Sequence, residues 1–103
     1  MSFEPMHQNV EKSQFELNHK GHTALLLYKQ NKGSKRIYLV HTEVPEAIQN
    51  EGVGQQLVKE ALDFVVQNEL KVVPLCPLVI AYLKRHPAYH GVIDESSKKD
   101  FVR

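Results

Sequence analysis

The sequence predicts one domain of the α+β or α/β class, in which helices pack on a mixed, largely antiparallel sheet with the order β-β-β-α-β-α. Three short apolar or alternating segments, separated by turn residues, occupy the first 44 positions and indicate an antiparallel meander. An amphipathic stretch and a short apolar run follow, as in a right-handed crossover to a parallel strand. With 103 residues, 42% of them hydrophobic, the chain is long enough to form one core.

The meander is expected to contain strands at residues 15–17, 23–29 and 36–44. Turn-forming residues at 18–21 and 31–34 lie between these segments and are typical of hairpin connections. The first half of the chain therefore predicts three antiparallel strands in sequence order.

The second half predicts a helix, a strand and a second helix. Pro45 ends the third strand, and a loop leads to a helix at about residues 55–68, whose apolar residues form one stripe. Residues 71–75 form a short apolar run of the kind found in buried strands. Pro77 suits the first turn of a helix that is expected to reach Arg85.

The chain divides into three parts by composition. Residues 1–14 are a polar N-terminal segment, residues 15–93 form the predicted domain, and residues 94–103 are a polar C-terminal tail. A short strand is expected at residues 92–93, before a polar or helical end.

Charge and composition exclude several classes of protein. Thirteen basic and twelve acidic residues leave a net charge of +1, without the basic surface that nucleic-acid binding requires. No segment is apolar and long enough to span a membrane, and the first ten residues lack the apolar core of a signal peptide. The single cysteine, Cys76, suits a reducing compartment. No metal-ligand spacing relates His7, His19, His22 and His90 to one another or to this cysteine. We therefore expect a cytoplasmic protein without nucleic-acid, membrane or metal partners.

Residues 49–54, read as Q-x-x-G-x-G, connect the third predicted strand to the amphipathic helix. Gly52 and Gly54 allow a ligand to approach the backbone closely, because neither carries a bulky side chain. The free N–H groups of the first helical turn and the positive end of the helix dipole favour an anion such as phosphate. An ordinary glycine turn without a ligand is the alternative interpretation.

These segments resemble the acetyl-CoA-binding core of the GNAT-type N-acetyltransferases, and in particular their small stand-alone domains. The resemblance rests on the strand, the Q-x-x-G-x-G loop, the helix and the next strand, together with three short motifs. The motifs are HTEVP at residues 41–45, PLCP at 74–77 and KRHPAY at 84–89. It covers residues 15–93 and implies a minimal GNAT-like fold.

The resemblance implies acetyl-CoA or CoA as co-substrate. By position, the loop of Gln49 would wrap the pyrophosphate, and the backbone of Glu43 and Val44 would align the pantetheine arm. The amides that would contact the phosphates belong to residues at the start of the helix: Gly52, Val53, Gly54, Gln55 and Gln56.

Cys76 is a candidate catalytic residue. It lies just after a predicted strand and directly before Pro77, so the dipole of the following helix favours its thiolate form. In that role the thiol carries the acetyl group or assists proton transfer beside the thioester. The alternative is that Cys76 is a small buried hydrophobic residue.

His41 is a candidate base for deprotonating the acceptor amine, because imidazole titrates near neutral pH. Strict alternation places it on the same face as Ile37 and Leu39, where a hydrogen-bonded core histidine is the alternative. His86 is interpreted in the same two ways, as a base or as the cap at the end of a helix, and Tyr89 as a proton donor or a packing residue.

Resemblance to an acetyltransferase implies an amine acceptor, either a small molecule or a peptide. Larger GNAT enzymes have two helices before the first strand, and this chain has only a short polar segment there. The acceptor half is therefore an open surface, is completed by a homodimer, or does not support efficient catalysis. The alternative function is a non-catalytic CoA-binding or protein-interaction module that retains the pyrophosphate loop.

Overall fold

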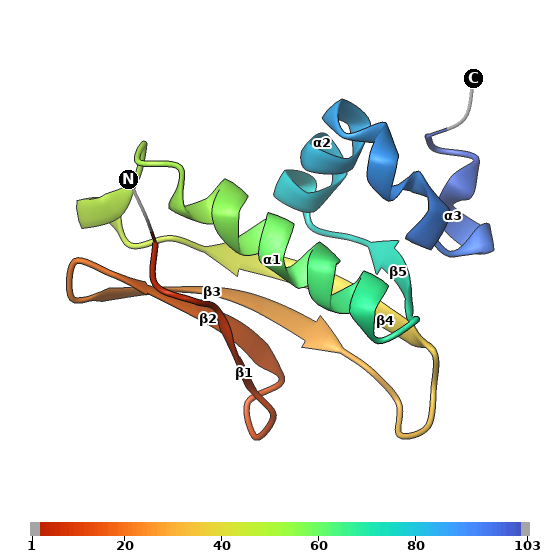
Figure 1. The fold of residues 1–103 in the computed structure, drawn as a ribbon, viewed down its shortest axis with the longest axis horizontal. Helices are drawn as coiled ribbons and strands as arrows, with labels where there is room; N and C mark the ends of the chain where they lie inside the picture. The colour runs from red at the N-terminus through yellow and green to blue at the C-terminus, as the bar shows by residue number, and fades with distance from the viewer. Residues whose placement is uncertain (1–2, 102–103) are drawn as a thin grey trace.

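The computed structural model describes residues 3–101 and contains one five-stranded sheet (Figure 1). Its strands lie in chain order: β1 (His7–Asn9), β2 (Gln14–His19), β3 (His22–Lys29), β4 (Arg36–Glu43) and β5 (Lys71–Pro74). The first four strands are antiparallel to one another in sequence, and β5 runs parallel to β4. This confirms the mixed, largely antiparallel sheet that the sequence predicts.

Helices cover this sheet in two groups. Helix α1 (Val53–Gln67) lies along the sheet, whereas α2 (Pro77–Arg85) and α3 (Glu95–Lys98) lie on the side of β5 (Figure 1). Two 3-10 turns, η1 (Glu46–Ile48) and η2 (Pro87–Val92), complete the chain. Within the part of the chain that the structure describes, no helix combines the length and apolar character needed to cross a membrane.

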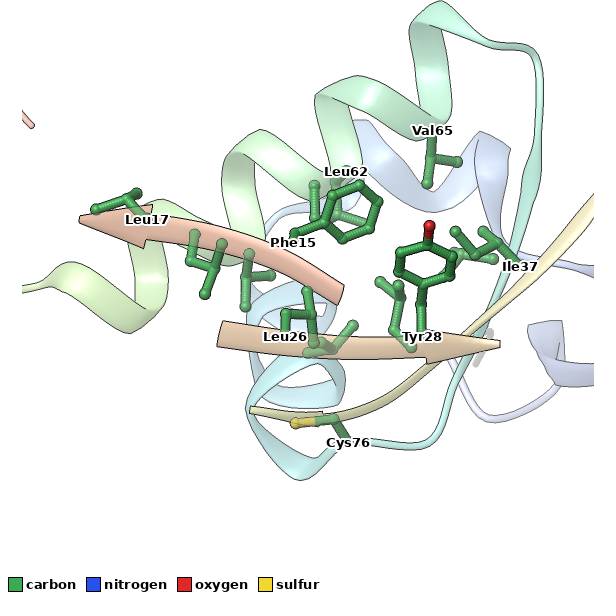
Figure 2. Close-up of a cluster of buried hydrophobic side chains, with 14 of the residues drawn as sticks. Phe15, Leu17, Leu26, Tyr28, Ile37, Leu62, Val65 and Cys76 are labelled. Atoms are coloured by element: carbon green, nitrogen blue, oxygen red, sulfur yellow. The ribbon is translucent and has the colours of Figure 1, made fainter. Parts of the chain in front are cut away.

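The core forms between α1 and the sheet (Figure 2). Leu62 and Val65 of α1 are fully buried and point toward Phe15 of β2, whose ring also packs 4.8 Å from the ring of Tyr28 on β3. The apolar stripe expected on this helix is confirmed, except that Val66 is half exposed at the stripe's edge. Burying these side chains is the main source of stability, at about 1.5–3 kcal/mol for each large apolar residue.

Strand β4 contains a bulge that changes which side chains share a face. Tyr28 pairs with Leu39, but Leu27 pairs with His41, so Val40 lies between the two pairs without a partner of its own. Successive residues of β3 point to opposite faces, and their partners therefore do the same. The prediction that His41 continues the face of Leu39 is wrong, because the bulge turns His41 to the opposite face.

Strand β1 is not predicted by the alternation of apolar residues, because polar contacts hold it. His7 pairs with Glu16 at 2.9 Å between Nε2 and Oε1, and the Asn9 side chain donates to the same carboxylate at 3.0 Å. Gln8 donates from Nε2 to the hydroxyl of Tyr28 at 2.7 Å. These pairs add a strand to the edge of the sheet within the segment expected to be polar and aperiodic.

The C-terminal residues return to β5. Ile93 is buried and forms an isolated parallel bridge with Val72, so the strand expected at residues 92–93 is reduced to one bridge. Asp94 then donates its N–H to the carbonyl of Val72 at 2.8 Å and caps α3 by accepting from the backbone of Ser96 at 3.1 Å. The helical end of the tail is confirmed, and it packs against the sheet.

Candidate functional site

A cavity of about 770 Å³ lies where β4 ends and α1 and α2 begin. Three segments line it, and they come from separate parts of the sequence. The lining residues are His41, Thr42 and Val44 from the end of β4; Ile48, Gln49, Asn50, Gly52, Val53, Gly54 and Gln55 from the glycine loop and the start of α1; and Cys76, Pro77 and Leu78 from the start of α2.

The cavity exists because β4 and β5 separate. Their parallel pairing ends at Leu39 and Pro74, and the Leu39 carbonyl accepts the N–H groups of both Leu75 and Cys76, at 2.9 and 3.0 Å. The chain after β5 then turns into α2, while β4 continues to Glu43. A gap opens between the end of β4 and the start of α2. It lies at the carboxyl ends of the strands, where open α/β sheets bind ligands.

The glycine loop directs backbone donors toward this gap. Gly52 has a φ of +81°, a conformation that suits glycine, and it precedes the first residue of α1. The first N–H groups of a helix have no acceptor within the helix. The first turn of α1 contains no acidic residue, so the positive end of its dipole is not neutralised from within the helix. This end of α1 is therefore suited to an anion.

Gly54 has a different role from Gly52. A Cβ atom at position 54 would lie 3.1 Å from Leu78 Cδ2 and 3.3 Å from Val44 Cγ2. Only glycine lets the first turn of α1 approach the end of β4 and the start of α2 this closely. Gln49 strengthens the same junction by donating from Nε2 to the carbonyl of Val44 at 3.1 Å.

Cys76 is buried, with 3% of its surface exposed, and it is the residue that precedes α2. Its thiol lies 3.1 Å from the hydroxyl oxygen of Thr42, at the end of β4. Thr42 belongs to the HTEVP motif, but no single-sequence pattern assigns it a role, because its contact with Cys76 arises from the pairing of β4 with β5. The structure therefore brings the candidate nucleophile and a hydroxyl together beside the cavity.

His41 also lines the cavity, but at its open side. Its side chain is 54% exposed, and its Nε2 lies 3.3 Å from a carboxylate oxygen of Glu43. Both residues lie on the face of β4 opposite Thr42, and Glu43 is not part of the cavity wall. His41 is thus an accessible histidine rather than the buried core histidine that was the alternative.

The sequence profile described as GCN5-related N-acetyl-transferase matches residues 14–92. The chain belongs to this acetyltransferase family. Its minimal GNAT-like fold agrees with the five-stranded sheet and the helices packed on it.

Several relatives carry the name Protein NATD1. The protein from Xenopus tropicalis is 42% identical over 64 residues, which cover 62% of this chain and 58% of the relative. The protein from Homo sapiens is also 42% identical over 64 residues, covering 62% and 56%, and the protein from Danio rerio is 39% identical over 71, covering 69% and 64%. The matched region thus spans less than two thirds of the length of these relatives.

The remaining candidates of this acetyltransferase domain have structural partners. His86 ends α2 by donating its N–H to the carbonyl of Leu83 at 3.2 Å, which confirms the capping interpretation. Tyr89 donates its hydroxyl to Asp63 at 2.6 Å, and burial, followed by this carboxylate, raises the pKa of Tyr89. Among residues 3–101, no group of three or more His, Cys, Asp or Glu side chains is arranged to hold a metal ion.

A second, smaller cavity of about 270 Å³ adjoins the first, and Gly52 and Gln55 line both. The side chains of Lys59, Arg85 and His86 also line it. Lys59 is paired with Asp63 at 2.9 Å, whereas Arg85 has no ion-pair partner among the described residues. The second cavity therefore adds a basic wall beside the glycine loop, which the sequence did not predict.

Proposed function

We propose that this domain binds acetyl-CoA and transfers its acetyl group to the amine of a small molecule or peptide, in the cytoplasm. One observation carries the proposal: a single cavity joins a helix N-terminus with free backbone donors to a buried thiol and an accessible imidazole. The first feature suits the pyrophosphate of CoA, and the other two suit acyl transfer.

The phosphates are assigned to the glycine loop. The amides of Gly52, Val53, Gly54 and Gln55 lie at the start of α1, and all four residues line the main cavity. Gln56 does not belong to this set, because its N–H already donates to the carbonyl of Gly52 at 3.0 Å. Backbone donors are effective here because they are fixed by the fold and need no side chain to be ordered. Gln49 is assigned a supporting role, since its amide holds the loop to Val44.

The pantetheine arm is assigned to the free edge of β4. Tyr28 donates its N–H to Ser13, on the side of β3 away from β4. In an antiparallel ladder the backbone groups of alternate residues point to the same side. The N–H and C=O groups of Leu26 therefore also point away from β4, as those of Tyr28 do. Their partners Leu39 and Thr42 therefore point their own N–H and C=O groups away from β3.

This geometry favours Thr42 and Val44 over Glu43 for pairing with the amides of pantetheine. Thr42 presents both backbone groups toward the cavity, and Val44 follows by alternation, although its carbonyl already accepts from Gln49. Pairing of an extended ligand with an exposed strand edge is a recurrent binding mode. The backbone of Glu43 points toward β3 in the same scheme.

Two routes of transfer fit the cavity. In the first, the Cys76 thiolate attacks the acetyl carbon, the bond from that carbon to the sulfur of CoA breaks, and the CoA thiolate takes the proton that Cys76 gave up. The acceptor amine then attacks the acetyl carbon, the bond to Cys76 breaks, and a base such as His41 removes the proton of the amine. In the second route the amine attacks the acetyl carbon of acetyl-CoA directly, the bond from that carbon to the sulfur of CoA breaks, and the proton that His41 removes from the amine passes to the CoA thiolate.

The basic second cavity suits the 3′-phosphate of CoA. It shares Gly52 and Gln55 with the pyrophosphate loop, so a ligand that contacts the loop is continuous with it. Arg85 supplies a guanidinium, which binds phosphate with paired hydrogen bonds.

Calorimetric titration with CoA and acetyl-CoA tests the cofactor, and an acetylation assay with a panel of amines tests the reaction. We expect micromolar binding of both ligands by the wild-type domain and none by the Gly54→Glu variant, which adds bulk between α1, Val44 and Leu78 and a negative charge beside the amides assigned to the phosphates. Binding without transfer to any amine would support a non-catalytic CoA-binding module instead. Equal affinity in the Gly54→Glu variant would overturn the assignment of the phosphate loop.

A further inference from the structure

Glu51 is the one residue of the segment 49–54 that does not line the main cavity. Its neighbours Asn50 and Gly52 both do, and both have positive φ, at +68° and +81°. This backbone turns the carboxylate of Glu51 away from the helix N-terminus that we assign to phosphate. A negative charge thus lies one residue before the anion site but outside it.

The carboxylate is held by the turn between β2 and β3. Glu51 Oε1 accepts from His19 Nε2 at 3.0 Å and from Lys20 Nζ at 2.9 Å. A carboxylate only accepts hydrogen bonds, so His19 carries a proton on Nε2. We call these three residues, His19, Lys20 and Glu51, the loop clamp.

The backbone of the β2–β3 turn brings His19 and Lys20 close to Glu51. Lys20 and Gly21 have φ values of +52° and +80° and form the two-residue turn between the paired residues His19 and His22. The Lys20 side chain is directed across the turn to Glu51, and hydrogen bonds from Lys20 first and then His19 lower the pKa of the Glu51 carboxyl. The carboxylate therefore remains ionised and occupied by partners at neutral pH.

Packing holds the histidine of the clamp in position. Only 8% of the His19 side chain is exposed, and the ring of Phe3 lies 5.0 Å from its ring. The same Phe3 is 4.0 Å from the position that a Cβ atom on Gly52 would occupy. The N-terminal segment, the β2–β3 turn and the glycine loop thus meet at one junction.

We propose that His19 and Lys20 are positioning residues for the phosphate-binding loop: they retain the Glu51 carboxylate outside the cavity, so that the amides of α1 meet an anionic ligand without a competing negative charge. This inference rests on the proposed function, because the ligand is CoA. The clamp acts on affinity rather than on the reacting thioester. Surface ion pairs such as Lys20–Glu51 contribute little to folding, so the clamp variants are expected to fold.

Titration with CoA distinguishes the clamp from an ordinary ion pair. Lys20→Met removes one of the two donors that hold the Glu51 carboxylate and leaves its charge beside the phosphate-binding loop, and it is expected to raise the dissociation constant about tenfold. Glu51→Gln removes the charge and is expected to change affinity no more than about twofold, because no repulsion remains. The Lys20→Met/Glu51→Gln double variant should therefore bind CoA more tightly than Lys20→Met alone.

The control is Lys32→Met, which makes the same change of charge in the turn at the other end of β3, outside the clamp. It is expected to bind CoA like the wild-type domain. The clamp is overturned if Lys20→Met binds CoA with wild-type affinity, or if the double variant binds as weakly as Lys20→Met. In acetyl transfer, Lys20→Met should raise KM for acetyl-CoA and leave kcat unchanged, since Lys20 lines neither cavity.

Amide hydrogen exchange separates failure of the clamp from failure of the proposed function. Exchange at residues 50–54 should become faster in Lys20→Met than in Lys32→Met, whether or not CoA binds. Unchanged exchange would overturn the clamp even if the wild-type domain binds CoA. If exchange is faster in Lys20→Met but the wild-type domain does not bind CoA, the result would support the clamp as a loop restraint and reject CoA as the ligand.

Discussion

The hydroxyl oxygen of Thr42 lies 3.1 Å from the thiol of Cys76, and this contact connects the end of β4 to the start of α2. It lies where the parallel strands β4 and β5 have just separated. As a donor, the Thr42 hydroxyl stabilises a thiolate on Cys76; as an acceptor, it orients the thiol. For the proposed acyl transfer, we therefore expect any covalent step to take place at this pair.

Thr42→Val tests this pair, because valine keeps the shape of threonine and removes the hydroxyl. If Cys76 carries the acetyl group, we expect Thr42→Val to slow formation of the acetyl-enzyme roughly ten- to a hundredfold, since a hydrogen bond to a charged group contributes about 1.5–3 kcal/mol. Intact-protein mass spectrometry after mixing with acetyl-CoA measures the rate. Cys76→Ser is the control and should form no thioester; an adduct that persists in it would place the acetyl group elsewhere.

Gly54→Ala tests the close approach of α1 to its neighbours. The added methyl group would lie 3.1 Å from Leu78 and 3.3 Å from Val44, so one wall of the cavity must shift. We expect CoA affinity to fall several-fold and the free energy of unfolding to fall by about 1–3 kcal/mol, the range for overpacking. Gly91→Ala is the matched control, because a Cβ atom there has no neighbour within 4 Å. Equal effects of the two substitutions would contradict the conclusion that position 54 must be glycine for α1 to pack against Leu78 and Val44.

Arg85→Gln tests the basic second cavity. The wild-type domain is expected to bind CoA about tenfold more tightly than dephospho-CoA, because a phosphate that contacts arginine gains charge-assisted hydrogen bonds. Arg85→Gln should remove most of this preference without changing affinity for dephospho-CoA. Lys84→Gln is the control, since Lys84 carries the same charge on the preceding residue and does not line the cavity. If Arg85→Gln weakens both ligands equally, the 3′-phosphate is bound elsewhere.

Most of the fold follows from the period of apolar residues. The stripe on α1 and the apolar run of β5 each consist of buried side chains within one continuous segment, so the local sequence is enough to predict both. The sequence also indicates Gly52 and Cys76, because a glycine loop and a proline at a helix start are local signals.

Other features depend on contacts between distant segments. The polar residues of β1 form a strand only because Glu16 and Tyr28 provide partners. The orientation of His41 depends on a bulge at Val40 that strict alternation does not reveal. The roles proposed for Thr42, Arg85 and the loop clamp depend on the arrangement of strands and helices, so no single motif identifies them.

Asp94 links the acid stability of the domain to its C-terminal residues. The Ser96 hydroxyl donates to the Asp94 side chain at 2.6 Å, and Arg36 pairs with it at 3.2 Å; these contacts, the Ser96 hydroxyl first, lower its pKa. A folded-state pKa below the unfolded value gives stability that is complete above about pH 4 and is lost as the pH falls through the folded value.

Asp94→Ala should lower Tm by about 4–8 °C at pH 7, as expected for about 1 kcal/mol from a lost helix cap, and should flatten the loss of stability below pH 4. Thermal unfolding between pH 3 and 7 measures both effects, with the exposed Asp100→Ala as control. An acid dependence in Asp94→Ala as steep as that of the wild-type domain would show that another carboxyl group governs it.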